Sequence, residues 1–430
     1  MIDSWFILLC GMADKRMFCN MKITKLCFFY YLCIAKNEKM ESLRNTHNIL
    51  LKERTSAIRR GLLDTIDFRA RLIAIKGSRG VGKTNFLLDF CKDHYKDDPS
   101  CLYVNINNLF FAMEGLFNFV ERFYKLGGKV LLLDQIHKYP NWDRELREAY
   151  DRFPDLQIVF TASSILRIKS NKYLHGIVEM YNLSGLSFRE FLELESGFKF
   201  PVYSFEEIVE HHEEIVNDIL EKVRPLAFFN NYLKYGYYPI YLEEKSHIDY
   251  LLKNINLTLE FDIPYNNQIE LKYLTKLKQL LFIVANGNSN INISKLSAQI
   301  GVSRATVLNY LHYMKNARLL TLLFDRESDD ENGLKPNQVF LHNPNLLNAV
   351  CLDQTDSLMV RKTFLISQLC AVAKLNYSGN EDLFVNRKYE VSVRQQGDKG
   401  RVRDSVILMT DMIERGKKNV IPLWLAGFVY

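Results

Sequence analysis

The stretch Gly77-Ser78-Arg79-Gly80-Val81-Gly82-Lys83-Thr84 decides the fold of this chain, because it fits the phosphate-binding pattern G-x-x-x-x-G-K-[ST]. The apolar run Leu72–Ile75 precedes it and a helix is expected over about Thr84–Cys91, so the loop joins a strand to a helix. In such a loop backbone N–H groups surround the phosphates, the lysine reaches the β- and γ-phosphates, and the final hydroxyl holds Mg²⁺. An ordinary glycine-rich turn is the alternative, but the flanking strand and helix argue against it.

We therefore expect ATP and Mg²⁺ as ligands of this loop. The predicted nucleotide-binding residues are Gly77, Gly80, Val81, Gly82, Lys83 and Thr84. Fifty residues after Thr84, the expected buried strand Lys129–Leu133 ends at Asp134 in the manner of a Walker B strand. A carboxylate at that edge of a parallel sheet is placed to bind Mg²⁺ through water, so Thr84 and Asp134 are the predicted metal ligands.

Strands and helices alternate through this first part of the chain. Further strands are expected at Cys101–Asn105 and Gln157–Thr161, and a helix at Leu109–Lys125. Apolar strands separated by helices predict an α/β fold in which helices cover both faces of a parallel sheet. Ser163 follows the last of these strands, and we interpret its hydroxyl as a sensor of the γ-phosphate or of the attacking water. A serine-rich helix cap is the alternative for Ser163.

The middle of the chain is predicted to be helical, and residues 191–275 are interpreted as a helical lid. Its segment Phe205–Val223 is strongly acidic and contains the pair His211-His212. Adjacent positions on a helix do not face one site, so a solvated helix face is favoured there over a metal site.

The segment Ile291–Leu311 has the pattern of a helix-turn-helix, with Gly301 between two short helices. The strands Leu319–Phe324 and Gln338–His342 resemble the two strands of a wing. Four residues near the exposed start of the second helix are the predicted DNA contacts: Ser303, Arg304, Thr306 and Asn309. Internal packing is the alternative role for this segment, because it contains few basic residues.

Length and composition indicate a globular protein of several domains, since 430 residues exceed one hydrophobic core. The formal net charge is +6, of which half falls in residues 1–39, so charge alone does not argue for nucleic acid. The eight cysteines show no metal-ligand spacing, and a cytoplasmic location is expected. Residues 1–39 look foreign to the rest, and Met40 is the expected natural start. A membrane anchor over the apolar run Leu26–Ala35 is the alternative.

Four stretches together resemble a family of prokaryotic AAA-type ATPases: Gly77–Thr84, Leu133–Trp142, Phe160–Ser164 and Leu186–Phe191. The resemblance extends over Met40–Tyr430. It implies a P-loop ATPase domain at 40–190, the helical lid at 191–275, a winged helix at 276–345 and a restriction-endonuclease-like domain at 346–430, after the extension at 1–39.

One departure from the resemblance concerns hydrolysis. Members of the family carry a glutamate directly after the Walker B aspartate, whereas this chain has Gln135. An amide holds water but does not accept its proton as a carboxylate does, so hydrolysis is expected to slow by roughly 10² to 10⁴. Gln135 and Ser163 are the residues assigned to the catalytic position.

The family's arginine before the Leu-Ser-Phe-Arg-Glu motif is also missing from this chain. Five other arginines are still candidates for an arginine finger: Arg144, Arg147, Arg152, Arg167 and Arg189.

A second departure concerns the C-terminal domain. A restriction-like nuclease needs clustered carboxylates and a lysine, but the strand Lys388–Gln396 contains no E-x-K triplet. Glu381, Asp382 and Glu390 are the possible acidic groups, and the domain is expected to be inactive. The leading interpretation is an ATP-binding switch with slow or absent hydrolysis. The alternatives are a DNA-binding regulator and a catalytically dead scaffold that binds an unknown protein partner.

Overall fold

The computed structural model describes residues 39–53, 57–243, 246–325, 334–351, 357–379, 383–398 and 403–430. The expected extension up to residue 38, with the apolar run Leu26–Ala35, lies outside the described residues, as do Glu381 and Asp382. Among the described helices, none combines the length and the apolar character needed to cross a membrane.

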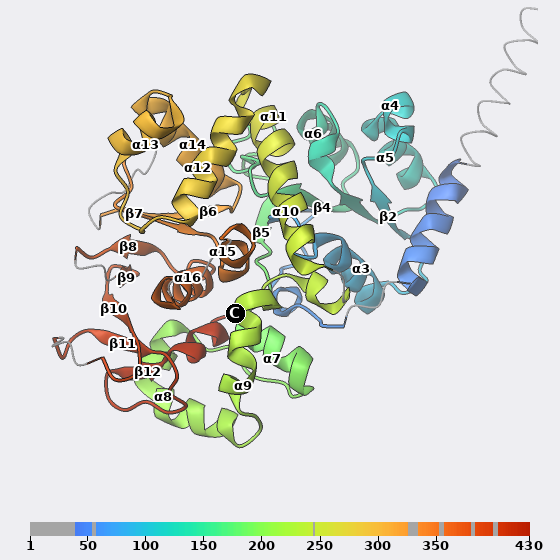
Figure 1. Cartoon of the computed structure of the whole chain (residues 1–430). Coiled ribbons are helices and arrows are strands. Elements are labelled where there is room, and N and C mark those ends of the chain that lie inside the picture. The colour runs from blue at the N-terminus through green and yellow to red at the C-terminus, as the bar shows by residue number, and fades with distance from the viewer. Residues whose placement is uncertain are drawn as a thin grey trace, which may run out of the picture.

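The first of two five-stranded sheets carries the phosphate-binding loop (Figure 1). Its strands are β1 (Leu72–Gly77), β2 (Cys101–Asn105), β3 (Val130–Asp134), β4 (Gln157–Ser163) and β5 (Glu179–Asn182). They all run parallel, in the order β2-β3-β4-β1-β5. The predicted α/β class with a parallel P-loop sheet is therefore confirmed.

Helices cover both faces of this sheet. Successive side chains of a strand point to opposite faces, so alternate residues of β1 belong to different cores. Helix α3 (Lys83–His94) shares a core with Ile73 and Ile75 of β1. The alternate residues Leu72 and Ala74 belong to the core on the other face. The helices of that face are α4 (Phe110–Glu114), α5 (Leu116–Lys125) and α6 (Trp142–Arg152).

Two local features differ from the sequence-based expectation. The expected helix Leu109–Lys125 is divided into α4 and α5 at Gly115, whose φ of 80° and ψ of 152° are open mainly to glycine. Strand β5 is not predicted by the sequence. It lies at the edge of the sheet with partly exposed side chains, and therefore lacks an apolar run.

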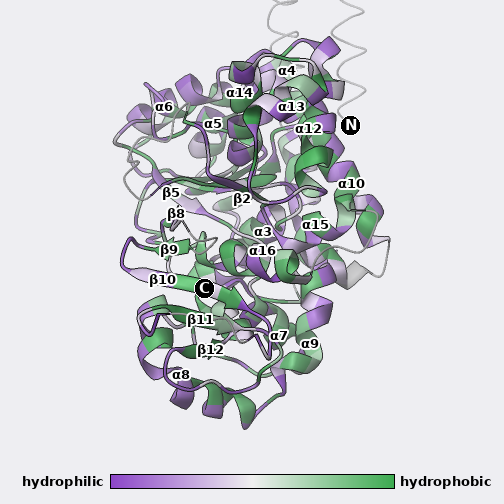
Figure 2. Ribbon diagram, turned by 60° about the vertical axis from the view of Figure 1, so that its left-hand side comes forward, coloured by the Kyte–Doolittle hydropathy of each residue, from purple (hydrophilic) through white to green (hydrophobic). Residues whose placement is uncertain are grey.

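The predicted lid of residues 191–275 divides between two cores. Helices α7 (Phe188–Ser196), α8 (Phe205–Leu220) and α9 (Pro225–Asn231) share a core with the C-terminal tail. Figures 1 and 2 both show α8 beside β12, away from the first sheet. The acidic helix therefore does not lie over the phosphate-binding loop, because its apolar side packs against the second domain instead.

A different helical segment approaches the loop. It consists of α10 (His247–Leu257), the π-helical turn η5 (Thr258–Asp262) and α11 (Ile263–Asn267), which follow one another directly. The chain then forms α12 (Leu274–Ala285), α13 (Ile293–Ile300), α14 (Arg304–Asn316) and the antiparallel strands β6 (Leu320–Leu323) and β7 (Gln338–Leu341). Gly301 ends α13 with a φ of 66°, so the two helices of the predicted helix-turn-helix are present where expected.

The second sheet lies in the C-terminal part of the chain. Its strands are β8 (Leu375–Tyr377), β9 (Leu383–Val385), β10 (Tyr389–Arg394), β11 (Ile407–Thr410) and β12 (Val420–Pro422), in the order β12-β11-β10-β9-β8. Helices α15 (Pro344–Val350) and α16 (Ser357–Leu369) precede it. The 3₁₀ helix η7 (Leu423–Phe428) is buried throughout, which confirms the expectation that the apolar tail enters a core.

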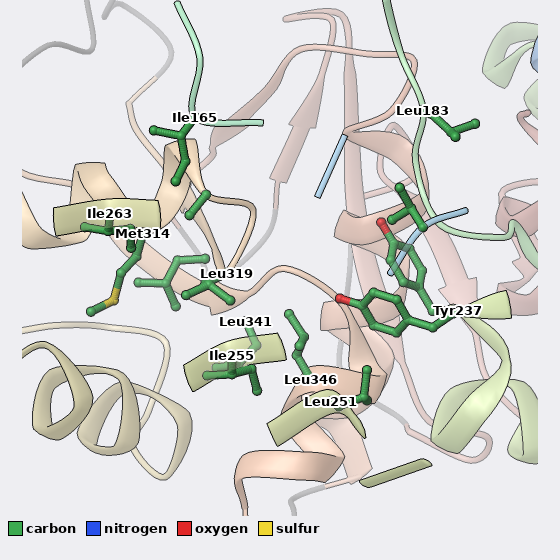
Figure 3. Packing of buried hydrophobic residues seen from close by; sticks show 14 of the residues in the cluster. Ile165, Leu183, Tyr237, Leu251, Ile255, Ile263, Met314, Leu319, Leu341 and Leu346 are labelled. Atoms are coloured by element: carbon green, nitrogen blue, oxygen red, sulfur yellow. The ribbon is translucent and has the colours of Figure 1, made fainter. Parts of the chain in front are cut away.

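One hydrophobic core joins the first sheet to the helices that follow η5 (Figure 3). Val81 of the loop belongs to it, together with Leu251 and Ile255 of α10, Ile263 of α11 and Met314 of α14. Protein cores are close-packed and transmit displacement. Helix α10 therefore packs in one core with the phosphate-binding loop and with the helix-turn-helix.

Candidate nucleotide-binding site

The phosphate-binding loop connects β1 to the N-terminus of α3. Gly80 and Gly82 have φ angles of 83° and 92°, in the region that favours glycine. A Cβ at Gly77 would lie 2.6 Å from the carbonyl oxygen of Leu183. Backbone geometry therefore explains why glycine stands at these three positions, and it leaves the loop N–H groups and the start of α3 open to an anion.

Lys83 is held inside the loop by two backbone carbonyls. Its Nζ donates to the oxygens of Gly77 at 2.9 Å and Ser78 at 2.7 Å. Burial lowers the pKa of Lys83 to about 8, and the nearby Asp134 carboxylate opposes that shift. A phosphate is a charged acceptor and binds an ammonium more strongly than a neutral carbonyl does. Lys83 is thus positioned to exchange its carbonyl partners for phosphate oxygens.

Asp134 is buried at the carboxyl end of β3 and accepts three hydrogen bonds from hydroxyl groups. Its Oδ2 accepts from Thr84 Oγ1 at 2.7 Å and from the Tyr103 hydroxyl at 2.9 Å, and its Oδ1 accepts from Thr161 Oγ1 at 2.5 Å. All three donors are neutral, so the hydrogen bonds orient the carboxylate without cancelling its charge. Carboxylate and hydroxyl oxygens are ligands that suit Mg²⁺, and the Thr84–Asp134 pair fits that ion.

Gln135 adopts a left-handed backbone conformation, with φ 59° and ψ 42°. Its N–H donates to Thr161 Oγ1 at 2.8 Å, which fixes the turn after β3. Its side chain lines the main cavity beside Lys83, and also a smaller cavity of about 300 Å³ on the side of the helix over residues 39–53. Ser163, 9% exposed at the end of β4, lines the main cavity as well.

His137 lines the same cavity and is not singled out by the sequence. Its Nδ1 is buried and has no hydrogen-bond partner within the described residues. Burial, followed by the charge of Lys83, lowers the pKa of His137 to about 4. The imidazole is therefore neutral at physiological pH and is a weak proton acceptor.

The main cavity has a volume of about 760 Å³, and Pro239 and Ile240 are among its lining residues. Tyr250 and Asn254 of α10 and Asp262 of η5 face into it. A Cβ at Gly80 would lie 3.2 Å from Asn254 Nδ2 and 3.4 Å from Tyr250 Cε1, so α10 touches the loop directly. Volumes of this order accommodate a nucleotide-sized ligand.

A buried ion pair ties the loop to α7. Arg60 Nε donates to both carboxylate oxygens of Glu190, at 3.1 and 3.2 Å, and its Nη1 donates to the carbonyl oxygen of Val81 at 3.0 Å. Burial alone would raise the pKa of Glu190, but Arg60 and Arg189 together lower it. Glu190 belongs to the Leu-Ser-Phe-Arg-Glu motif, so that motif supports the loop without contacting the cavity.

The arginines considered as fingers do not line the cavity. Arg189 donates to Glu193 at 2.6 Å and to the backbone oxygen of Tyr430 at 3.1 Å, which is a structural role. Arg147 pairs with Asp151 at 2.8 Å on the surface of α6. The cavity-lining residues of the described chain include neither these nor Arg144, Arg152 and Arg167.

Sequence reasoning missed Tyr103, Asn254 and Asp262. Tyr103 lies on β2 and reaches Asp134 only because β2 and β3 are neighbours in register. Asn254 and Asp262 come from helices more than 150 residues after the loop. No local pattern marks such contacts, because they depend on how distant elements pack.

Comparison with known proteins supports this assignment for part of the chain. Residues 69–192 match the family model of an AAA domain, and residues 227–353 match a domain of unknown function (DUF8612). The first match contains the phosphate-binding loop, Asp134 and Gln135. This part of the chain is therefore an AAA-type P-loop domain.

Individual relatives are distant. An uncharacterized protein of Methanocaldococcus jannaschii is 26% identical over 267 residues, which cover 59% of this chain and 56% of that protein. The aligned region thus spans little more than half of that relative's length. Among solved structures, AMPPCP-bound DnaA from Aquifex aeolicus is 14% identical with a TM-score of 0.24, covering 63% of this chain and 86% of that chain. PCH-2 of C. elegans is 14% identical with a TM-score of 0.23, covering 66% and 68%.

Proposed function

We propose that this protein is an AAA-type switch that binds ATP with Mg²⁺ and hydrolyses it slowly or not at all. The observation that carries the proposal is an amide, Gln135, at the position after Asp134, in a cavity whose other groups suit a nucleotide. The loop N–H groups and Lys83 would bind the phosphates. Thr84 and Asp134 would hold Mg²⁺, which when bound screens phosphate charge.

Slow hydrolysis follows from the amide at position 135, the position from which a carboxylate would accept the proton of the attacking water. Gln135 can hydrogen-bond a water but cannot take its proton, and such a loss slows hydrolysis by roughly 10² to 10⁴. His137 is close by, but its pKa of about 4 makes it too weak a base to compensate. Ser163 can orient a water or sense phosphate, but its neutral hydroxyl is also a poor acceptor for the proton of that water.

The test measures ATP affinity and single-turnover hydrolysis for the wild type, Gln135→Glu and Lys83→Ala. We expect wild-type binding with little turnover, a gain of about 10² to 10⁴ in turnover for Gln135→Glu, and loss of binding for Lys83→Ala. Brisk wild-type hydrolysis would contradict the slow switch. Failure of the folded wild type to bind ATP would contradict the nucleotide site itself.

A second candidate is DNA binding through a winged helix formed by α12, α13, α14, β6 and β7. Arg304 and Asn309 are exposed near the start of α14, as recognition residues must be. Two of the four predicted contacts have another role, since the Ser303 hydroxyl accepts from the Thr306 N–H at 3.1 Å and caps the helix. Titrating duplex DNA at several salt concentrations tests this candidate, because phosphate contacts impose a steep salt dependence that Arg304→Ala should reduce.

A further inference from the structure

An ion pair links the phosphate-binding loop to the helix above it. Arg79 Nε donates to Asp262 Oδ2 and Arg79 Nη2 donates to Asp262 Oδ1, both at 2.6 Å. The Asp262 side chain is 6% exposed and that of Arg79 27%. A two-point guanidinium–carboxylate pair of this geometry is strong and directional. Its partners are 183 residues apart in the chain, so it fixes the position of η5 on the loop.

The π-helical turn of η5 accounts for the position of Asp262. Tyr250, Asn254 and Asp262 all line the cavity, although Asn254 lies one turn after Tyr250 and Asp262 two turns after Asn254. In an uninterrupted α-helix, residues spaced by four drift steadily around the helix. A π turn takes up one extra residue and reverses part of that drift, and such turns are frequent at functional sites. The turn at Thr258–Asp262 thus keeps the carboxylate facing the loop.

Asp262 is a negative charge in a cavity that we assign to a polyphosphate. Left alone it would repel the phosphates, and Arg79 now offsets its charge. Asp262 takes the Nε N–H and one Nη2 N–H of Arg79, so a terminal phosphate binding the remaining N–H donors would share the guanidinium charge with Asp262 and weaken the pair. Asn254 Nδ2 is a second hydrogen-bond donor on this side of the loop. It is buried close to Gly80 and has no partner in the described residues, so it is available to a phosphate.

We propose that the Arg79–Asp262 pair is a phosphate-sensitive clasp: the terminal phosphates of a bound nucleotide compete with Asp262 for Arg79 and release α10–η5 from the loop. This inference rests on the proposed nucleotide site and adds its regulation. A triphosphate, with more charge within reach of Arg79 than a diphosphate, opens the clasp more completely.

The release would reach the helix-turn-helix through packed side chains. Leu251, Ile255 and Ile263 lie in one core with Met314 of α14, as Figure 3 shows. Glu260 of η5 also pairs with Lys278 of α12 at 2.5 Å. Movement of α10–η5 is therefore carried to α12 and α14.

The first test compares ATP and ADP affinity in the wild type, Asp262→Asn and the control Glu270→Gln. The control removes an exposed carboxylate that pairs with Lys272 rather than with Arg79. We expect Asp262→Asn to bind ATP about tenfold more tightly, with a smaller gain for ADP, and Glu270→Gln to match the wild type. Equal or weaker ATP binding by folded Asp262→Asn overturns the clasp, whereas no binding by the wild type overturns the proposed nucleotide site.

A second measurement needs no variant and keeps the test valid if Asp262→Asn fails to fold. Hydrogen exchange of the amides in 258–267 is measured in the wild type with and without saturating ATP and Mg²⁺. We expect faster exchange with ATP, because the segment loses its anchor to the loop. Unchanged or slower exchange in a protein that binds ATP overturns the clasp.

Discussion

The two five-stranded sheets both carry carboxylates with little exposure near strand ends, but the partners of these carboxylates differ. On the first sheet, Asp134 accepts hydrogen bonds from three neutral hydroxyls. On the second, Asp411 follows β11 and pairs with Arg361 at 2.7 Å, and Glu390 of β10 pairs with Arg403 at 2.6 Å. An arginine offsets the charge within the fold, whereas neutral hydroxyls do not. We expect this difference to separate a ligand site from structural ion pairs.

The comparison fits the expectation that the C-terminal domain is inactive as a nuclease, which stays a prediction. Glu390 is followed by Val391 and Ser392, so the strand lacks the lysine that such a site uses. Across the described ranges, no group of three His, Cys, Asp or Glu side chains could hold a metal ion. Glu381 and Asp382 lie outside those ranges.

On the first sheet, the largest effect on Mg²⁺-dependent binding is expected from Asp134→Asn. Removing the carboxylate charge should abolish most of the gain in ATP affinity that Mg²⁺ provides, a loss of about 10- to 100-fold, since charged oxygen ligands dominate Mg²⁺ binding. ATP titrations with and without Mg²⁺ measure it. Asp151→Asn on the exposed face of α6 is the matched control and should behave as the wild type. A variant that keeps the full Mg²⁺ dependence would show that Asp134 is structural, like its counterparts on the second sheet.

Asp411→Asn should destabilise the protein without changing ATP affinity. Its side chain is 7% exposed and that of Arg361 14%, and removing one partner of such a buried pair costs about 3 kcal/mol, because the arginine stays buried without its counter-charge. Denaturant unfolding measures the loss. Asp398→Asn, which breaks the more exposed pair with Arg394, is the control and should cost less. A large fall in ATP affinity at full stability would contradict the structural role.

Local sequence predicted the first sheet and its loop well, because each element carries its own signal. The run Val130–Leu133 is apolar since both faces of its sheet are covered, and the glycines of the loop follow from positive φ angles. The same holds for α13 and α14, where Gly301 ends one helix and Ser303 begins the next.

The covering of the loop could not be predicted in this way. A uniform helical pattern over residues 191–275 does not reveal that α8 packs on the second domain while α10 packs on the loop. That choice depends on long-range burial, such as the contact of α8 with the tail around Trp424. The Arg79–Asp262 pair is invisible for the same reason, since neither residue has a local partner that marks it.

His342 is a buried ionisable group that differs from Asp411, because the arginine near it, Arg318, disfavours its charged form. It is 5% exposed, lies 3.0 Å from Thr321 Oγ1 through Nδ1, and has a pKa lowered to about 3 by burial and by nearby Arg318. Because the folded pKa lies below the unfolded value of 6.5, the unfolded state gains protons first as pH falls, and stability is lost from about pH 6.5 downward.

Between pH 7 and 5 this loss should amount to about 2 kcal/mol. His342→Gln should flatten the pH dependence of unfolding by that amount. The free energy of unfolding, measured at several pH values, decides the matter. An equal slope in wild type and His342→Gln would show that His342 is not held neutral by the fold.

The smallest effect is expected from Glu390→Gln. Arg403 is 65% exposed, so solvent screens the pair and its loss should cost less than about 1 kcal/mol. Denaturant unfolding measures that cost, and incubation of duplex DNA with Mg²⁺ measures cleavage. We expect neither the wild type nor the variant to cut DNA, because the guanidinium already neutralises Glu390 and no lysine of β10 completes a metal-assisted site. Cleavage by the wild type that Glu390→Gln abolishes would make the second sheet a catalytic surface, and would remove the contrast between arginine-paired and hydroxyl-bound carboxylates.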